Sequence, residues 1–546
     1  MNRRVVLFLT ALLTLSACGP QEPESLGGPP LMRRLTEDQY RRIVADVFGP
    51  DIVIGGRFAP LTRTDGLLAL GASASIINSS SYELYDNLAR AIAAQVVDSA
   101  HRDWLVPCKP GVEDGPDTAC AAQFFKQTGR LLYRRHLTDD ELKLQVELAA
   151  LGAKELKSFY NGLAASLSAM LVAPEFLFIN DTTEKDEKAS GGVRLTAYAK
   201  ASRLSFFLWN TSPDHSLLTA AEKGELNDSA GIAKQVARLM ASPRIEDGTR
   251  AFFNDMLAFE TFDTLQKDAV IYPAFGLATV KDAREQILRT IVDHLLVQKA
   301  DYRGLFTTRK TFMSAPLGMV YRAPADDPDG WAAYEFPDGD QHVGIQSFVG
   351  FVSLHSHPGR SSATLRGKAV RETLMCQKVP DPPANVDFTL VSDSANPIYK
   401  TARERLAAHS TEPSCAGCHK LMDPIGLTLE NFDGAGQWRK TENGIAINTG
   451  GALDGVAYDD AVGLGKALAA NPSVPSCLVN RLVNYATGRT ADRKWLAYLE
   501  QKFSDDKYRL PDLLQRIARS DVFYAVTPAQ TSTQAAGSAG AREGKS

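Results

Sequence analysis

The sequence predicts a mainly α-helical protein assembled from several packed helical modules. Apolar residues recur at helical spacing, for example at Leu163, Leu167, Met170 and Leu171, and this period dominates the chain. With 546 residues the chain is long enough for about two to five domains. Its 44% apolar and 23% charged residues are typical of a globular protein.

The overall charge argues against nucleic acid as a partner. The formal net charge is −4 and the isoelectric point is about 6.2, whereas proteins that neutralise phosphates carry an excess of positive charge. The mean hydropathy is −0.17, and the long apolar run of the chain lies at its start. We therefore expect no membrane-spanning helix after residue 18.

The first thirty residues predict export. Two arginines precede an apolar run that is too short to span a membrane, which is typical of a secretory signal peptide over 1–17. The run ends in Leu15-Ser16-Ala17-Cys18, which resembles the bacterial lipobox, so we expect a lipid on Cys18. An ordinary signal followed by an incidental cysteine is the alternative. A flexible tether rich in Pro, Gly and Glu over 18–30 would hold the exported, lipid-anchored body at the bacterial cell envelope, on the outer membrane or its periplasmic face.

Capping boxes and composition shifts divide the chain into modules. Thr36 with Gln39, and Thr138 with Glu141, match the pattern that begins a helix, and polar stretches rich in Pro, Gly and Asp mark the joints. The expected modules are a first helical module at 31–105, a second at 106–182, a third at 190–322, a distinct module at 340–445 and a C-terminal helical module at 450–526. Residues 527–546 predict a disordered tail, since they are rich in small and polar residues.

The module at 340–445 contains the motif Cys415-Ala416-Gly417-Cys418-His419. This C-x-x-C-H spacing lets two thiols add to the vinyl groups of one haem while the adjacent imidazole reaches the iron. It predicts covalently bound haem c held by Cys415, Cys418 and His419, in a small cytochrome c-like haem module. A Cys415–Cys418 disulfide and a zinc site completed by His409 are the alternatives.

The remaining cysteines are even in number, so all of them can form disulfides. With Cys18 assigned to lipid and two cysteines to haem, four remain. The simplest pairing joins Cys108 to Cys120 across a Gly/Pro/Asp-rich loop, and Cys376 to Cys477. Disulfides are expected in an oxidising compartment, which agrees with export.

The sequence predicts one axial ligand of the iron and offers several candidates for the other. His419 is expected to be the proximal ligand, while Met422 lies too close along the chain to reach the opposite face of the same haem and is expected to pack. His355 or His357 is the first candidate for the sixth ligand, followed by Met375. An open or water-bound position is the alternative.

Three charged residues follow the motif closely. Glu430, Asp433 and Arg439 are candidates for hydrogen bonds or ion pairs at the haem edge or its propionates. Local ion pairing within a turn is the alternative.

The segment after His419 resembles a known family. It is similar to the signature C-x-x-C-H-x-x-M-D-P-x-G-x-x-L-E-x-F-D-x-x-G-x-W-R of planctomycete-type cytochrome-like multi-module proteins, which are assembled from domains of unknown function numbered in the fifteen-eighties and fifteen-nineties. Further similarity covers most of the chain, with motifs at 34–49, 120–142, 203–214, 360–383 and 485–489. The resemblance implies export, a c-type haem site and a mainly helical multi-module body, and it implies no settled reaction.

Three functions stay open at this point. The first is electron transfer by a c-type haem lipoprotein to or from a redox partner protein, which we favour. The second is a haem-dependent oxidative or peroxidase-like enzyme acting on an unknown organic or polymeric substrate. The third is a non-haem binding or scaffold protein in which Cys415 and Cys418 form a disulfide. The sequence contains no G-x-S-x-G, no H-E-x-x-H and no common phosphate-binding glycine loop.

Overall fold

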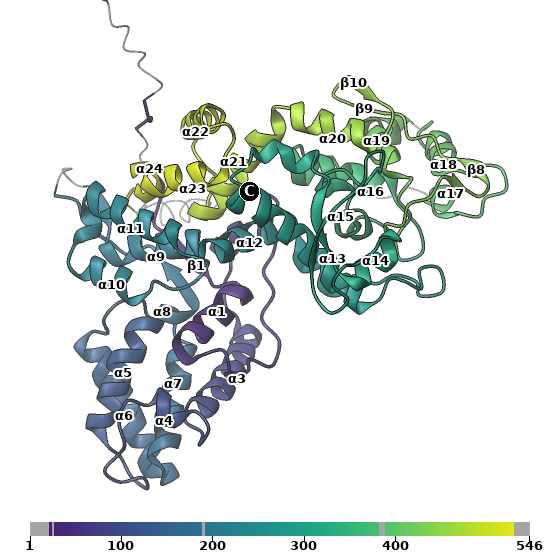
Figure 1. The fold of residues 1–546 in the computed structure, drawn as a ribbon. Helices are drawn as coiled ribbons and strands as arrows, with labels where there is room; N and C mark the ends of the chain where they lie inside the picture. Colours follow the sequence, from purple (N-terminus) through teal and green to yellow (C-terminus); the bar gives the residue numbers. More distant parts are fainter. Residues whose placement is uncertain (1–20, 25–26, 188–191, 382–387, 412, 529–546) are drawn as a thin grey trace, which may run out of the picture.

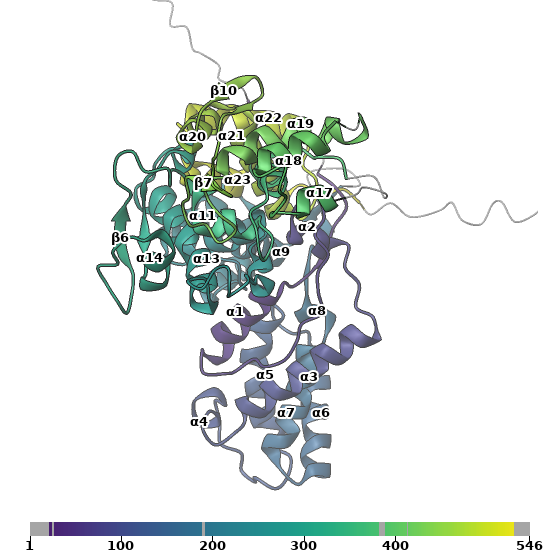
Figure 2. The same cartoon turned by 90° about the vertical axis from the view of Figure 1, so that its right-hand side faces the viewer.

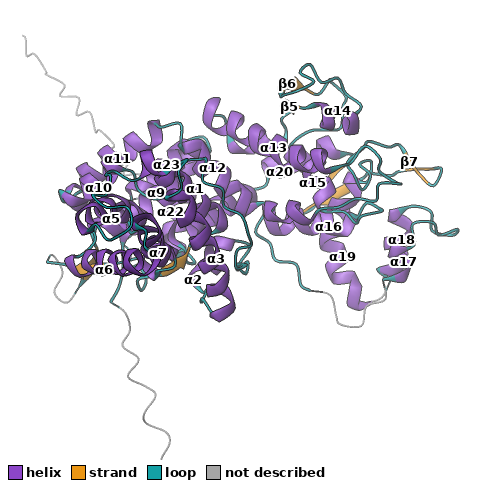
Figure 3. Cartoon of the chain, turned by 90° about the horizontal axis from the view of Figure 1, so that it is seen from below, coloured by secondary structure: helices purple, strands orange, loops and turns teal. Residues whose placement is uncertain are grey.

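The computed structural model describes residues 21–24, 27–187, 192–381, 388–411 and 413–528. The predicted signal peptide, Cys18 and residues 529–546 of the predicted tail lie outside the described residues. The described chain is mainly α-helical, as predicted, and its short strands pair into small antiparallel sheets (Figure 3). In the parts of the chain that the structure describes, we find no helix with both the length and the apolar character that a membrane crossing requires.

Residues 32–180 form a lobe that projects from the rest of the molecule (Figures 1 and 2). Its elements are β1 (Met32–Arg34), α1 (Glu37–Phe48), α2 (Leu68–Ser73), α3 (Ser79–Val96), α4 (Arg102–Leu105), α5 (Thr118–Leu132), α6 (Asp139–Leu156), α7 (Phe159–Leu171), α8 (Pro174–Leu177) and β2 (Phe178–Asn180). Strand β1 pairs with β2, which brings the beginning and the end of the lobe together. Apart from α2, the helices of the lobe enclose an apolar core of their own, whereas buried apolar residues of α2 belong to the core of the rest of the molecule.

Both predicted capping boxes are present. The backbone N–H of Gln39 donates to Thr36 Oγ1 at 3.2 Å, and the N–H of Glu141 donates to Thr138 Oγ1 at 3.2 Å. These caps satisfy backbone donors that a helix leaves unpaired in its first turn. The sequence therefore predicted the starts of α1 and α6 correctly.

The elements after the lobe begin with a helical region that leads toward the module of the C-x-x-C-H motif (Figure 1). They are β3 (Thr183–Lys185), β4 (Val193–Leu195), α9 (Ala197–Leu208), α10 (His215–Glu222), η1 (Glu225–Asn227), α11 (Ser229–Ala241), α12 (Ile245–Met256), η2 (Phe259–Thr264), α13 (Leu277–Val292), η3 (Asp293–Val297), η4 (Tyr302–Phe306), β5 (Lys310–Met313), α14 (Ala315–Tyr321) and β6 (Ala332–Glu335). Strand β3 pairs with β4, and β5 with β6.

The remaining elements form the module that contains the motif and the C-terminal helices. They are η5 (Ile345–Ser347), α15 (Val349–Leu354), α16 (Ala363–Ala369), η6 (Val370–Leu374), α17 (Thr389–Ser392), α18 (Ala402–His409), α19 (Pro413–Gly426), η7 (Leu427–Leu429), β7 (Thr441–Glu442), β8 (Ile445–Ala446), β9 (Gly451–Leu453), β10 (Val456–Tyr458), α20 (Ala461–Ala470), α21 (Ser473–Thr487), α22 (Arg493–Asp505), α23 (Leu510–Arg519) and α24 (Asp521–Tyr524). Strand β7 pairs with β8, and β9 with β10.

One apolar core runs through the elements after the lobe. It includes buried residues from α9, α13, α15, η6 and α21, so the regions predicted as separate modules share a single interior. A buried ion pair anchors α9, with Arg203 and Asp181 2% and 3% exposed and 2.6 Å apart. This continuity means that the wall of any site in the 340–445 region is supported by residues far away in the sequence.

The predicted disulfides are confirmed. Cys108 is bonded to Cys120, and Cys376 to Cys477. The second bond spans 101 residues and joins the segment after η6 to α21. It therefore fixes the module of the C-x-x-C-H motif to the C-terminal helices.

The described part of the predicted tether lies against the C-terminal helices. Trp495 Nε1 donates to Glu22 Oε1 at 3.1 Å, and the backbone N–H of Thr527 donates to the carbonyl of Gly28 at 3.0 Å. Arg489 also donates to the carbonyl of Pro29 at 2.7 Å. The described part of the segment is thus held in place, which differs from the flexible tether predicted from its composition. Composition does not reveal contacts with residues from the other end of the chain.

Candidate functional site

A cavity of about 500 Å³ lies at the C-x-x-C-H motif. Its volume falls within the range of roughly 300–1,000 Å³ that is usual for small-molecule and cofactor sites. The residues that line it come from the loop before α16, from α16 to α19, and from the segment between η6 and α17. All three motif residues, Cys415, Cys418 and His419, lie on its wall.

Helix α19 presents one face to the cavity. Cys415, Cys418, His419 and Met422 are spaced i, i+3, i+4 and i+7, which places them on the same side of a helix. Met422 is buried, with 6% of its surface exposed, as expected of a packing residue. The motif therefore gives a face on which two thiols and one imidazole lie side by side.

Two glycines fix the position of α19 against α16. A Cβ atom on Gly367 would lie 2.0 Å from the carbonyl oxygen of Met422, and one on Gly426 would lie 1.7 Å from that of Ala363. No larger residue fits at either position without moving the backbone. The close contact between these helices sets the distance between the motif and the wall formed by α16.

A buried carboxylate orients His419. Asp423 Oδ2 lies 2.8 Å from His419 Nδ1, and the two side chains are 10% and 13% exposed. Thr364 Oγ1 donates to the other oxygen of Asp423 at 3.0 Å. The hydrogen bond to Asp423 raises the pKa of His419 above its ordinary value, and burial opposes it. Because Nδ1 faces the carboxylate, Nε2 is the nitrogen left for a metal, in the arrangement that metal-binding histidines usually have.

The two motif cysteines take part in neither disulfide. Both are partly buried, and Cys418 Sγ lies 3.9 Å from the carbonyl oxygen of Pro380. Nowhere in the described residues are three or more His, Cys, Asp or Glu side chains grouped so that they could hold a metal ion. The geometry thus gives no support to a zinc site completed by His409. Two thiols outside the disulfides and one oriented imidazole at a single cavity are the groups that a c-type haem would need.

The structure separates the predicted sixth-ligand candidates. His357 lines the cavity, whereas His355 is not among the lining residues and packs its ring on Phe351 at a centroid distance of 4.8 Å. Burial, together with the charges of Arg366 and Lys267, lowers the pKa of His355 to about 4.

Met375 is 2% exposed and belongs to the apolar core. It is likewise absent from the residues that line the cavity in the described chain. Of the three candidates, His357 is therefore the one that the fold brings to the motif.

From the sequence, His409 was considered only as a possible zinc ligand. Its position next to His419 on the cavity wall was not predicted. His409 is the last residue of α18 and lines the cavity. Its ring centroid lies 5.1 Å from that of His419, with an angle of 79° between the ring planes. The spacing H-x5-C-x-x-C-H is the signal in the sequence that marks it.

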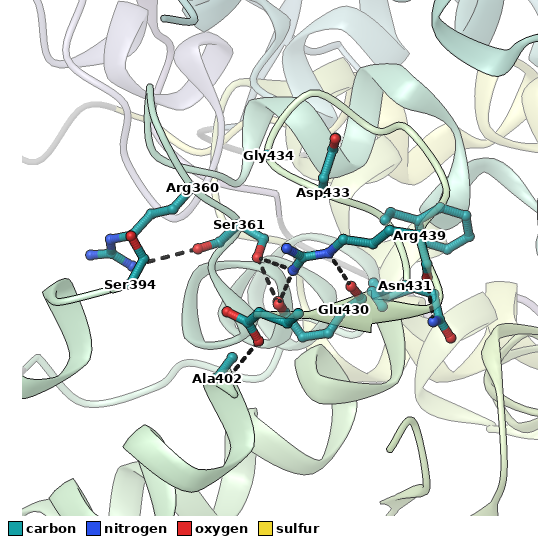
Figure 4. Close-up of polar contacts among 12 residues, drawn as sticks. Arg360, Ser361, Ser394, Ala402, Glu430, Asn431, Asp433, Gly434 and Arg439 are labelled. Atoms are coloured by element: carbon teal, nitrogen blue, oxygen red, sulfur yellow. Dashed lines mark hydrogen bonds and ion pairs between the residues drawn. The ribbon is translucent and has the colours of Figure 1, made fainter. Parts of the chain in front are cut away.

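Glu430, Asp433 and Arg439 are not among the described residues that line the cavity. Figure 4 shows the polar contacts that they make instead. Ser361, which does line the cavity, donates to Glu430 Oε2 at 2.6 Å, and Arg439 Nη2 lies 3.1 Å from the same oxygen. Asp433 Oδ1 accepts two backbone N–H bonds at 2.9 Å within the following turn. These contacts correspond to the local ion pairing that the sequence left as the alternative, and they make Glu430 a support for Ser361.

Positive charge gathers on the cavity wall. Arg360, Lys368 and Arg405 line the cavity. Arg405 is paired with Glu442 at 2.6 Å, and Lys368 lies 3.6 Å from Asp381. Arg360 contacts Ser392 Oγ at 3.4 Å. Burial and the neighbouring Arg405 lower the pKa of Arg360, and Glu430 opposes this shift. Such cations suit the carboxylates of a bound group.

Comparison with known protein families identifies four domains in the chain. They match families each described as a protein of unknown function, DUF1595 over residues 120–181, DUF1592 over 195–322, DUF1588 over 342–442 and DUF1585 over 454–523. The chain thus contains four domains of the planctomycete-type multi-module family, which confirms this part of the resemblance. No curated protein and no solved structure matches the chain significantly. The cavity lies within the region matched by DUF1588.

Proposed function

We propose that this chain is an exported c-type haem protein that transfers electrons to or from a redox partner protein. The observation that supports the proposal is the single α19 face that brings Cys415, Cys418 and His419 to one cavity, with His419 oriented by Asp423. Haem, when bound, supplies a one-electron couple at its iron.

The residues of the chain have distinct roles in this proposal. The thiols of Cys415 and Cys418 would attach the cofactor, and His419 Nε2 would bind its iron. Asp423 accepts the hydrogen bond from His419 Nδ1 and keeps the ring in one orientation. Arg360 and Lys368 provide positive charge for the propionates.

Export and lipid anchoring are part of the same proposal. The lipobox-like sequence at Cys18 and the two disulfides favour an oxidising compartment, since such bonds are rare in the reducing cytosol. Covalent haem attachment to C-x-x-C-H also agrees with an exported protein. We propose that the protein is held at the cell envelope through a lipid on Cys18.

A peroxidase-like oxidative enzyme is the second candidate, and the carboxylate that accepts from His419 is the observation that favours it. A negative partner makes the imidazole a stronger donor and stabilises the oxidised iron. This candidate also needs a coordination position that exogenous ligands can reach. Electron transfer needs none.

The test is to produce the exported protein in a host with haem-maturation machinery. The intact mass, measured under denaturing conditions, should exceed that of the lipidated polypeptide by one haem, and a C415S/C418S variant should lose this mass while keeping both disulfides. A wild-type mass equal to that of polypeptide plus lipid would refute the proposal. Rapid binding of cyanide or carbon monoxide by the holoprotein would favour the enzyme over the electron carrier.

A further inference from the structure

We infer that His409 is the second axial ligand of the haem, on the side opposite His419. The inference rests on the proposed function and assigns a residue that sequence reasoning had not connected with the iron. It would make the site six-coordinate through two imidazoles and close it to exogenous ligands.

Helix α18 faces the cavity in the same manner as α19. Ala402, Arg405, Leu406 and His409 line the cavity at spacings of i, i+3, i+4 and i+7. The face of α19 that carries His419 lines the same cavity with the same spacing. The cavity is thus bounded by two helix faces, each of which provides one histidine.

The two imidazoles are already neighbours. Their ring centroids are 5.1 Å apart and their planes are inclined by 79°. Two imidazoles on opposite sides of one metal, with metal–nitrogen bonds of about 2 Å, have centroids roughly 6 Å apart. The observed centroid distance is thus within about 1 Å of the distance that binding to one metal would require.

Helix α18 is anchored well enough to hold a ligand. Thr401 caps its first turn, with the N–H of Glu404 donating to Thr401 Oγ1 at 3.2 Å. Arg405 Nη2 donates to Glu442 Oε1 at 2.6 Å, and Leu406 packs against Ala363 and Leu427. His409 lies one turn beyond Arg405, so these contacts determine the direction in which that face points.

His357 is the competing candidate on the cavity wall. It belongs to the loop after α15, and Lys267 Nζ donates to its carbonyl at 3.1 Å. The ring of His409 contacts that of His419, whereas within the described residues the ring of His357 makes no such contact with His419. The geometry therefore favours His409, and H357A is the matched control.

The experiment compares the wild-type holoprotein with H409A and H357A. The mass of covalent haem is measured first. A wild-type protein without it would overturn both the proposed function and the assignment of His409. With haem present, the wild-type and H357A proteins should show low-spin ferric spectra and resist carbon monoxide in the ferrous state. H409A should lose the low-spin spectrum, bind carbon monoxide readily, and regain the low-spin spectrum when imidazole is added.

Two results would overturn the assignment of His409 while leaving the proposed function intact. One is an H409A spectrum identical to that of the wild type, and the other is the same spectral loss in H357A instead. If H409A does not accumulate as a folded protein, H409M replaces it. Methionine keeps a sixth ligand, so this variant should stay low-spin with a raised reduction potential. An unchanged potential in H409M would contradict the inference.

Discussion

Replacing Asp423 with Asn should raise the reduction potential of the haem without displacing His419. In the wild type, His419 Nδ1 lies 2.8 Å from the Asp423 carboxylate. An Asn side chain keeps an oxygen that can accept this hydrogen bond, but it lacks the negative charge. That charge stabilises the ferric state through the imidazole, because the ferric iron carries one more positive charge. Loss of the charge therefore favours the ferrous state.

The size of the effect follows from the hydrogen bond and its burial. A hydrogen bond to a charged group contributes about 1.5–3 kcal/mol and one between neutral groups about 0.5–1.5 kcal/mol, a difference of roughly 1.5 kcal/mol. Both side chains are mostly shielded from water, at 10% and 13% exposure. For a one-electron couple this difference corresponds to an increase of about 65 mV.

The assay is a spectroscopic redox titration of the wild type, D423N and D433N. D433N is the matched control, since it also removes one negative charge near the motif while its carboxylate contacts backbone N–H groups and not His419. An unchanged potential in D423N, or an equal shift in D433N, would refute the role assigned to Asp423. Equal covalent haem content in all three proteins ensures that only the potential is compared.

Three stability predictions follow from the packing. D181N leaves a buried arginine unpaired and should lower the free energy of unfolding by about 3–5 kcal/mol in urea titrations. Burial raises the pKa of Asp181, but Arg203 outweighs it and the pKa is lowered, so this stabilisation is complete above the unfolded-state pKa of about 3.9 and is lost as the pH falls through the lower folded-state value. D181N should therefore lose less stability below pH 4 than the wild type does. G426A should lower the melting temperature, because the added Cβ causes a clash that costs about 1–3 kcal/mol or more. G417A on the same helix should leave it unchanged, since an added Cβ there meets nothing within 4 Å. Equal melting temperatures for the two variants would contradict the helix contact. A C376S/C477S variant should lose up to about 4–5 kcal/mol in thermal denaturation, because the bond closes a loop of 101 residues, and full retention of stability would contradict this.

The features that the sequence predicted well are those set by neighbours along the chain. The Thr36 and Thr138 capping boxes depend on residues three positions apart, and the structure contains both. The C-x-x-C-H motif places its three side chains on one helix face for the same reason. The count left four cysteines, and the short loop between Cys108 and Cys120 made their pairing the simplest of the three possible arrangements.

Such local rules could not predict which histidine lies near His419 at the cavity. His355 and His357 differ by two residues, and only the turn after α15 decides that His357 reaches the cavity wall while His355 packs on Phe351. His409 approaches His419 because α18 and α19 lie along the same cavity, which is a tertiary relation. The spacing H-x5-C-x-x-C-H shows only that His409 is close to the motif along the chain, and not which way its side chain faces.

The position of the cavity in the larger body explains why one small site is accompanied by so much protein. Arg366 is fully buried and donates to the carbonyls of Leu429 and Phe432 at 2.7 and 2.6 Å, which fixes the turn after α19. Lys267, from the preceding domain, donates to the carbonyl of Ser353 in α15 and to those of Ser356 and His357 in the loop that follows. Since buried carbonyls need such partners, both walls of the cavity depend on residues outside their own segment. Together with the disulfide to α21, these contacts connect the surroundings of the cavity to the neighbouring domains.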